Sequence, residues 1–132
     1  MSQADFEALR ARYEAVTRGD RAAIYRDVHP GFTLKTPDQV PSAGTYLGAE
    51  EATRFVEDFW EPFEEVIIEP QEFRENGDRI VSLLLVRLRH TGSSAFVEIR
   101  VANLWTMRDG KPISCEWFPQ REKALQAAGL SE

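Results

Sequence analysis

The sequence has very few cysteine and histidine side chains. Its 132 residues include one cysteine, Cys115, and two histidines, His29 and His90. A lone cysteine excludes an internal disulfide, and these three residues do not have the spacing of a zinc site. We therefore expect no bound metal and no cofactor. Cys115 lies in a predicted strand without an evident base beside it, so we interpret it as a small core or interface residue more readily than as a nucleophile.

Long apolar runs and basic patches are also missing. No run approaches the roughly 20 apolar residues of a membrane span, and the acidic N-terminal segment does not look like a signal peptide. The 16 Lys and Arg against 22 Asp and Glu give a net charge of −6, which argues against nucleic acid and anionic membranes as partners. We expect a soluble cytoplasmic protein with a single domain over residues 1–132.

Residues 95–118 consist of two alternating apolar runs joined by Asp109-Gly110. Asp-Gly between such runs predicts a two-residue type I′ turn, because that turn needs positive φ at both positions. The turn fixes the register of the two strands, and opposite residues then point to the same face. The predicted pairs on one face are Asn103 with Glu116, Trp105 with Ser114, and Val101 with Phe118.

A second hairpin is predicted just upstream, where Gly92-Ser93 separates residues 79–90 from the same strand. One face of the resulting three strands is nearly all apolar, and its main exception is a polar row. Arg87 meets Glu98 on the other face, a favourable pair that supports the register. The pairs are Leu88 with Val97, Val86 with Ile99, Leu84 with Val101, Ser82 with Asn103, and Ile80 with Trp105, and the polar row is Ser82, Asn103 and Glu116.

The remaining elements follow from apolar spacing and from glycine and proline positions. Helices are predicted over residues 6–16, 21–28, 48–60 and 120–128, and strands over 32–36 and 63–73, with Pro70 marking an edge or a bulge. Residues 36–46 are rich in proline, glycine and small polar residues and are predicted to form a loop. This order predicts an α+β fold in which helices cover one face of a curved sheet around a cone-shaped cavity.

Several segments together resemble the nuclear transport factor 2-like superfamily, and most closely its SnoaL-like, polyketide cyclase-like branch. They are Arg18-Gly19-Asp20, the strand at Phe32, Tyr46-Leu47-Gly48 before the third helix, and residues 103–111. The resemblance covers essentially the whole chain. It implies a cystatin-like α+β roll with three N-terminal helices packed on a curved, mostly antiparallel sheet and a short C-terminal helix. The superfamily contains cyclases, isomerases, epoxide hydrolases, dehydratases and non-catalytic domains, so function must be argued from the site.

The ketosteroid isomerases of this superfamily offer one residue-by-residue comparison. Their base aspartate falls on about Thr36 and their oxyanion-hole acid falls on Asn103, so the base is missing here. Their oxyanion-hole tyrosine falls near Arg12, with Tyr13 one step away. The resemblance therefore does not carry over steroid isomerisation by that mechanism.

The polar row supports two interpretations. Glu116 on an apolar face would be desolvated and suited to acid-base catalysis, with Asn103 polarising a substrate oxygen. Alternatively, the row is a core network whose members satisfy one another. Side chains expected to line the cavity, each also open to a packing interpretation, are Ser82, Trp105, Phe118, Phe32, Phe55, Phe59, Trp60, Tyr25 and His29.

Two functions follow from these interpretations. The first is an enzyme that binds a hydrophobic small molecule, acting without cofactor as a cyclase, isomerase or hydratase on a carbonyl compound. The second is a non-catalytic ligand-binding or protein-interaction module. In either case the outer face of the sheet is too apolar for water and predicts a homodimer, unless the C-terminal helix covers that face. The residues concerned are Val81, Leu83, Leu85, Ala102, Leu104 and Trp117, beside Arg87 and Glu98.

Overall fold

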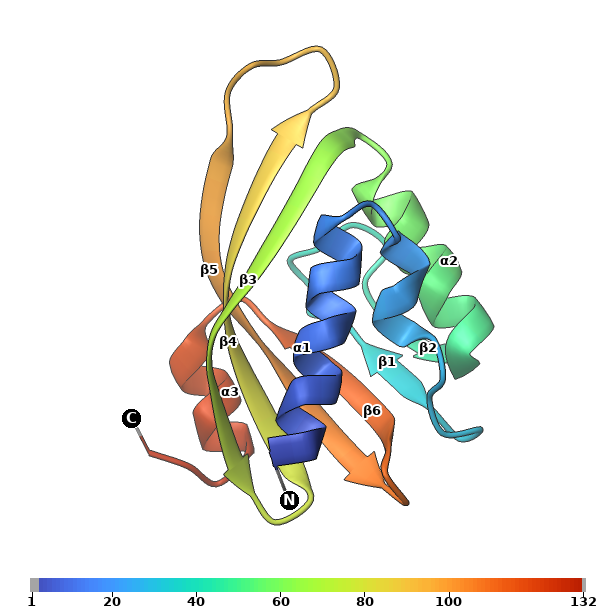
Figure 1. Ribbon diagram of the computed structural model, residues 1–132, viewed down its shortest axis with the longest axis vertical. Coiled ribbons are helices and arrows are strands. Elements are labelled where there is room, and N and C mark those ends of the chain that lie inside the picture. Colours follow the sequence, from blue (N-terminus) through green and yellow to red (C-terminus); the bar gives the residue numbers. More distant parts are fainter. Residues whose placement is uncertain (1–2, 132) are drawn as a thin grey trace.

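A six-stranded curved sheet forms the wall against which the helices pack (Figure 1). The computed structural model describes residues 3–131. Neighbouring strands are antiparallel except for the parallel pair of β1 and β6. In the spatial order β2-β1-β6-β5-β4-β3, the strands are β2 (Thr45–Leu47), β1 (Thr33–Lys35), β6 (Lys111–Phe118), β5 (Val97–Arg108), β4 (Arg79–His90) and β3 (Phe63–Asn76).

Helices cover both faces of this sheet. Helix α1 (Gln3–Thr17), the 3-10 helix η1 (Arg21–Tyr25) and helix α2 (Gly48–Trp60) lie over the inner face, and α3 (Arg121–Ala127) lies behind the sheet (Figure 1). The main core fills the space between the inner face and the first three helices. Within residues 3–131, no helix is long and apolar enough to cross a membrane.

The predicted α+β fold is confirmed, with three differences in detail. Helix α2 lies between β2 and β3 along the chain, so only α1 and η1 precede the strands. The second helix is a 3-10 turn that ends at Tyr25, three residues early, and Asp27 has a φ of 54°, which a right-handed helix does not allow. The end of the predicted loop forms strand β2, which pairs with β1 and is too short to show an alternating pattern.

The β4–β5 hairpin has the predicted register. All five predicted pairs are present, including Ser82 with Asn103 and Ile80 with Trp105. Arg87 Nε lies 3.0 Å from Glu98 Oε2 on the outer face. The register predicted from the Gly92-Ser93 turn is therefore present from the pair of Leu88 and Val97 onward.

The β5–β6 hairpin has the predicted turn but a shifted register. Asp109 and Gly110 have φ angles of 53° and 79°, as a type I′ turn requires. Beyond it Met107 pairs with Pro112 whereas Thr106 pairs with Ser114, which leaves one extra residue in β6 and shifts every later pair by one. Proline has no backbone N–H to donate to the strand ladder, and prolines inside a sheet are therefore found at bulges.

The shift moves the side chains of β6 to the opposite faces. Asn103 lies opposite Trp117, and Glu116 lies opposite Leu104 of the outer face. The predicted pairing of Asn103 with Glu116 is therefore wrong, because a slip of one residue exchanges the two faces of a strand. Trp117 points inward instead.

Helix α3 covers the lower half of the outer face. Ala124, Leu125 and Ala128 pack there against a cluster of buried residues from β4 and β5. Those residues are Val81, Leu83, Ala102 and Leu104, four of the six apolar residues that motivated the homodimer through this face. For these four residues the alternative interpretation is the correct one, because the C-terminal helix covers them. The outer face therefore no longer gives a reason to expect a dimer.

Candidate ligand-binding site

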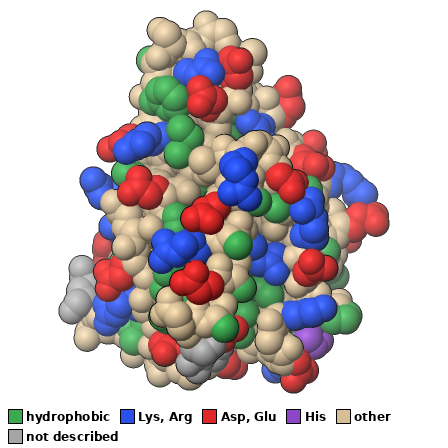
Figure 2. Space-filling view, in the orientation of Figure 1, with side chains coloured by type: hydrophobic (Ala, Val, Ile, Leu, Met, Phe, Trp, Pro, Cys, Tyr) green, Lys and Arg blue, Asp and Glu red, His purple; other side chains and the backbone are tan. Residues whose placement is uncertain are grey.

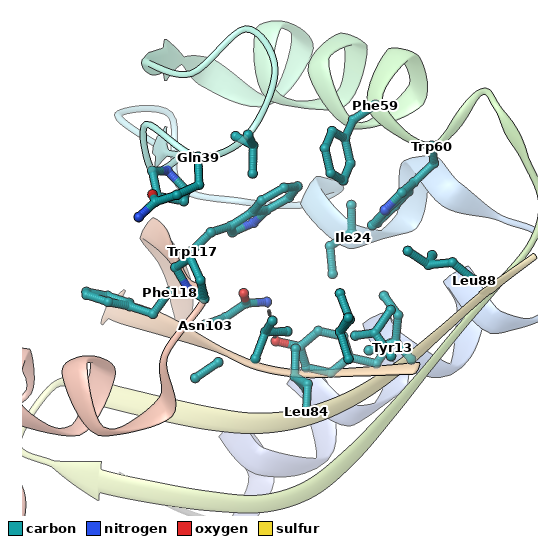
Figure 3. Close-up of a pocket in the computed structure, with 18 of the residues that line it drawn as sticks. Tyr13, Ile24, Gln39, Phe59, Trp60, Leu84, Leu88, Asn103, Trp117 and Phe118 are labelled. Atoms are coloured by element: carbon teal, nitrogen blue, oxygen red, sulfur yellow. Dashed lines mark hydrogen bonds between the residues drawn. The ribbon is translucent and has the colours of Figure 1, made fainter. Parts of the chain in front are cut away.

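A cavity of about 250 Å³ lies between the inner face of the sheet, the covering helices and the loop at residues 36–44 (Figure 3). Its floor is the apolar inner face of β4 and β5, and aromatic side chains form much of the opposite wall. Gln39, Ile99 and Pro119 are the exposed members of the lining and mark its mouth. The apolar lining includes Ile24, Phe59, Trp60, Ile68, Leu84, Val86, Leu88, Val101 and Trp117.

A buried hydrogen-bond network lies at the floor of the cavity around the Tyr13 hydroxyl. The oxygen accepts hydrogen bonds from Asn103 Nδ2 at 2.8 Å and Trp105 Nε1 at 2.9 Å, and it lies 2.5 Å from Ser82 Oγ. Because two donors already occupy its lone pairs, the Tyr13 hydrogen is left to bond Ser82. Tyr13 is fully buried, and this burial raises the pKa of its phenol, so the hydroxyl stays neutral.

The Tyr13→Phe substitution should lower the free energy of unfolding by about 2–3 kcal/mol, because it leaves the amide of Asn103 buried without its acceptor and weakens the bonds of Trp105 and Ser82. Urea denaturation followed by circular dichroism measures the change. Tyr46→Phe is the matched control, since the Tyr46 hydroxyl bonds only a loop carbonyl, that of Ser42. A loss no larger than that of the control would contradict the role of the network.

Asn103 presents the only unused polar atom at this floor among the described residues. Its Nδ2 is held by Tyr13, whereas its Oδ1 has no partner in the part of the chain that the structure describes. The amide oxygen points into the cavity in Figure 3. The residue is 8% exposed, so this acceptor can be satisfied only by something in the cavity.

A second buried tyrosine, Tyr25 of η1, forms hydrogen bonds with two side chains of β6. Tyr25 Oη accepts a hydrogen bond from Trp117 Nε1 at 2.8 Å and donates one to Cys115 Sγ at 3.4 Å. Burial raises the pKa of the Tyr25 phenol well above its usual value and that of the Cys115 thiol to about 12. Cys115 is therefore a protonated core thiol, in line with its interpretation from sequence.

The structure brings only part of the predicted site together. Asn103, Tyr25, Phe59, Trp60 and Phe118 border the cavity. Ser82 and Trp105 lie beneath the floor in the Tyr13 network. Three other predicted residues lie behind the lining or away from it: Phe32 packs on Tyr25, Phe55 packs on Trp117, and His29 Nδ1 accepts a bond from the Gly31 amide.

Glu116 is the main correction to the predicted site. Its side chain is 35% exposed, and Oε2 lies 3.7 Å from Lys35 Nζ. It does not border the cavity, because the bulge in β6 turns it to the other face. The predicted row of Ser82, Asn103 and Glu116 is therefore wrong, and Tyr13 is the third member of the polar group.

Sequence reasoning left out two residues with polar groups at the site, Tyr13 and Trp117, and the aliphatic lining of the cavity. Tyr13 stood in the apolar stripe of α1, one position after the residue that the resemblance pointed to. Arg12, at that position, faces away and donates to the carbonyls of Ile24 at 3.2 Å and Asp27 at 3.1 Å. Within residues 3–131, no Asp, Glu, His, Lys or Arg borders the cavity.

Comparisons with known proteins agree with this architecture. A family model described as the SnoaL-like domain matches residues 9–114, whereas a comparison with curated proteins finds no match. A structure of TerC co-crystallized with polyporic acid has a TM-score of 0.75 and 24% identity, over 94% of this chain and 96% of that one. An NTF2-like protein of unknown function from Burkholderia pseudomallei has a TM-score of 0.77 and 23% identity, over 97% and 98%.

A third similar structure, from Catenulispora acidiphila, has a ketosteroid isomerase-like fold and is in complex with trimethylamine. Its TM-score is 0.73 with 15% identity, over 98% of this chain and 95% of that one. At these identities the structures establish the fold and leave the activity open. The family model spans most of the chain, and the chain therefore belongs to the SnoaL-like domain family.

Proposed function

We propose that this protein binds an uncharged, flat hydrophobic molecule that carries a hydroxyl group at its buried end. The observation that carries the proposal is the unpaired Oδ1 of Asn103 at the floor of an otherwise apolar cavity. Pockets of this kind hold the ligand by apolar contact and use a few polar atoms to orient it. The cavity volume of about 250 Å³ suits a molecule of two or three fused or linked rings.

The walls favour a flat ligand. Trp117 packs beside the stacked rings of Phe55 and Phe59, with ring centroids 5.4 and 5.3 Å away, and Tyr25 fixes its indole nitrogen. The cavity floor opposite these rings consists of branched aliphatic side chains of β4 and β5. A planar molecule between the aromatic wall and this floor would place one edge at Asn103 and the other at the mouth near Gln39. TerC, which shares the fold, was co-crystallized with polyporic acid, and this supports a small-molecule ligand.

Binding without acid-base catalysis accounts for this site better than a cyclase, isomerase or hydratase. Those reactions need a group that takes up and returns a proton within reach of the substrate. In the described part of the chain no carboxylate or imidazole borders the cavity, and the Tyr13 hydroxyl is fully engaged. The position of Glu116 does not support the role that the sequence suggested for it.

A pair of probes that differ in one hydrogen-bond donor tests this proposal. We expect 2-naphthol to bind about 5- to 10-fold more tightly than 2-methoxynaphthalene, because one hydrogen bond to a buried acceptor contributes about 1 kcal/mol. The Asn103→Leu variant should bind both probes equally. Isothermal titration calorimetry measures the four dissociation constants.

Two further variants serve as controls. Glu116→Gln should bind both probes as the wild type does, since this carboxyl lies outside the cavity. Val101→Trp should block both, because Val101 borders the cavity close to its mouth. Equal affinity of the two probes for the wild type would contradict the proposed role of Asn103, and loss of binding in Glu116→Gln would restore that residue to the site.

A further inference from the structure

Strand β5 has a free edge over residues 97–101. Strand β6 ends at Phe118, opposite Ala102, so the first five residues of β5 have β4 on one side and no strand on the other within the described chain. This part of β5 lies at the outer margin of the sheet in the upper half of Figure 1. Its unpaired backbone groups are therefore available to another strand.

Exposed apolar side chains gather at this edge. Phe96, Val97 and Ile99 are 45%, 51% and 40% exposed, and they are three of the four large hydrophobic residues exposed in the described chain. Figure 2 shows hydrophobic side chains reaching the surface near this end of the molecule, among charged ones. Exposed apolar groups beside a free strand edge are typical of an interaction site.

The edge of β3, at the other side of this hairpin, is protected in ways that β5 is not. It contains Pro70 and a register shift after it. Residues 97–101 contain no proline and no bulge. Proteins usually block edge strands with such features, so an unblocked edge suggests that a strand is meant to pair there.

We propose that this edge pairs with the same edge of a second copy of the chain, as an antiparallel ladder centred on Ile99. A twofold axis normal to the sheet brings residues of the same face opposite one another, so the ladder must be centred on a residue. Centring on Glu98 or on Arg100 would place like charges opposite each other. Centring on Ile99 places Glu98 of each copy opposite Arg100 of the other, and this register alone is complementary in charge.

The existing contacts leave both charges available for this pairing. Glu98 Oε2 lies 3.0 Å from Arg87 Nε of its own chain. In the dimer, Glu98 would therefore lie between this arginine and Arg100 of the other copy. Within residues 3–131, the one hydrogen-bond partner of Arg100 is Gln71, whose Oε1 lies a long 3.4 Å from Arg100 Nη1. On the inner face, Ile99 meets its counterpart and Val97 meets Val101, which covers the exposed side chains of Val97 and Ile99.

The interface is small, because only five residue pairs fit before β6 begins. Interfaces below the standard size give weak or transient complexes, so we expect a concentration-dependent dimer with a dissociation constant of about 10–100 μM. Ile99 and Val101 also border the cavity, so the second copy would lie beside its mouth. The dimer itself requires no ligand and does not depend on the proposed ligand site.

Charge reversal at the two positions tests the register. Analytical ultracentrifugation of the ligand-free protein, from about 1 μM to about 1 mM, should show the dimer for the wild type. Glu98→Lys and Arg100→Glu should each weaken association at least 10-fold by placing like charges opposite one another. An equimolar mixture of the two variants should associate again, because each residue then meets the opposite charge.

Glu57→Lys is the matched control, since it makes the same charge change on the exposed face of α2 and should leave the dimer unchanged. A wild type that stays monomeric throughout the concentration range would overturn the proposal. So would a dimer that both edge variants retain, which would point to another interface. Failure of the mixed variants to associate would overturn the Ile99-centred register.

Discussion

The Leu125→Asp substitution should lower the free energy of unfolding by about 3–5 kcal/mol, because it places a charge in an apolar contact and removes the packing of a buried leucine. Leu125 is 5% exposed and lies against the outer-face cluster of Val81, Leu83, Ala102 and Leu104. Helix α3 has only seven residues, too few to be stable without this contact. We therefore expect α3 to detach and the cluster to become exposed.

The exposed cluster should make this variant self-associate, since large apolar patches on soluble proteins cause association. Urea denaturation measures the stability, and light scattering measures the association. Gln126→Asp, at an exposed position of the same helix, is the control and should change the free energy of unfolding by less than about 0.5 kcal/mol. A Leu125→Asp variant as stable and as monodisperse as this control would show that α3 does not hold the outer face.

The central hairpin could be predicted from sequence because two independent signals agreed. The position of the Gly92-Ser93 turn fixed the pairs, and these pairs put Ile80, Leu84 and Trp105 together on one apolar face, which is buried in the structure. The Arg87 and Glu98 pair, on the opposite face, falls into place in the same register. A turn position and a charge pair that agree therefore specify the alignment of two long strands.

The β5–β6 register could not be predicted in the same way, although the turn was correct. Strand β6 has eight residues, and each of its faces ends in an aromatic residue: Trp117 lies on the face of Cys115, and Phe118 lies on the face of Glu116. Hydrophobicity alone therefore does not choose between them. Pro112 was the available signal, because a proline within a paired strand indicates a bulge. This one residue decided whether Glu116 or Trp117 faced the cavity.

Two of the polar residues at the floor of the cavity could be predicted from the sequence. Ser82 and Asn103 were recognised as polar residues on an apolar face, and the structure places both in the Tyr13 network. Tyr13 itself follows the apolar spacing of α1, and a tyrosine in such a stripe looks like any other core residue. Which helix residue meets a sheet residue depends on tertiary packing, which local patterns do not encode.

A rise in pH from 9 to 11 should remove about 5 kcal/mol of stability, because three buried acids must stay protonated in the folded state. These are Tyr13, Tyr25 and Cys115, and burial raises the pKa of each above its usual value of 10.0 for the phenols and 9.0 for the thiol. In the unfolded chain they ionise at those usual values. The folded state therefore binds more protons than the unfolded state above pH 9, and stability is lost as pH rises.

Variants that remove one acid each assign this loss. Between pH 9 and 11, Cys115→Ala should lose about 2 kcal/mol less than the wild type, and Tyr13→Phe about 1 kcal/mol less, since the slope is about 1.4 kcal/mol per pH unit for each group beyond its unfolded pKa. Urea denaturation at half-unit pH steps measures the slopes. Equal slopes in all three proteins would contradict the raised pKa values of the buried phenol and thiol.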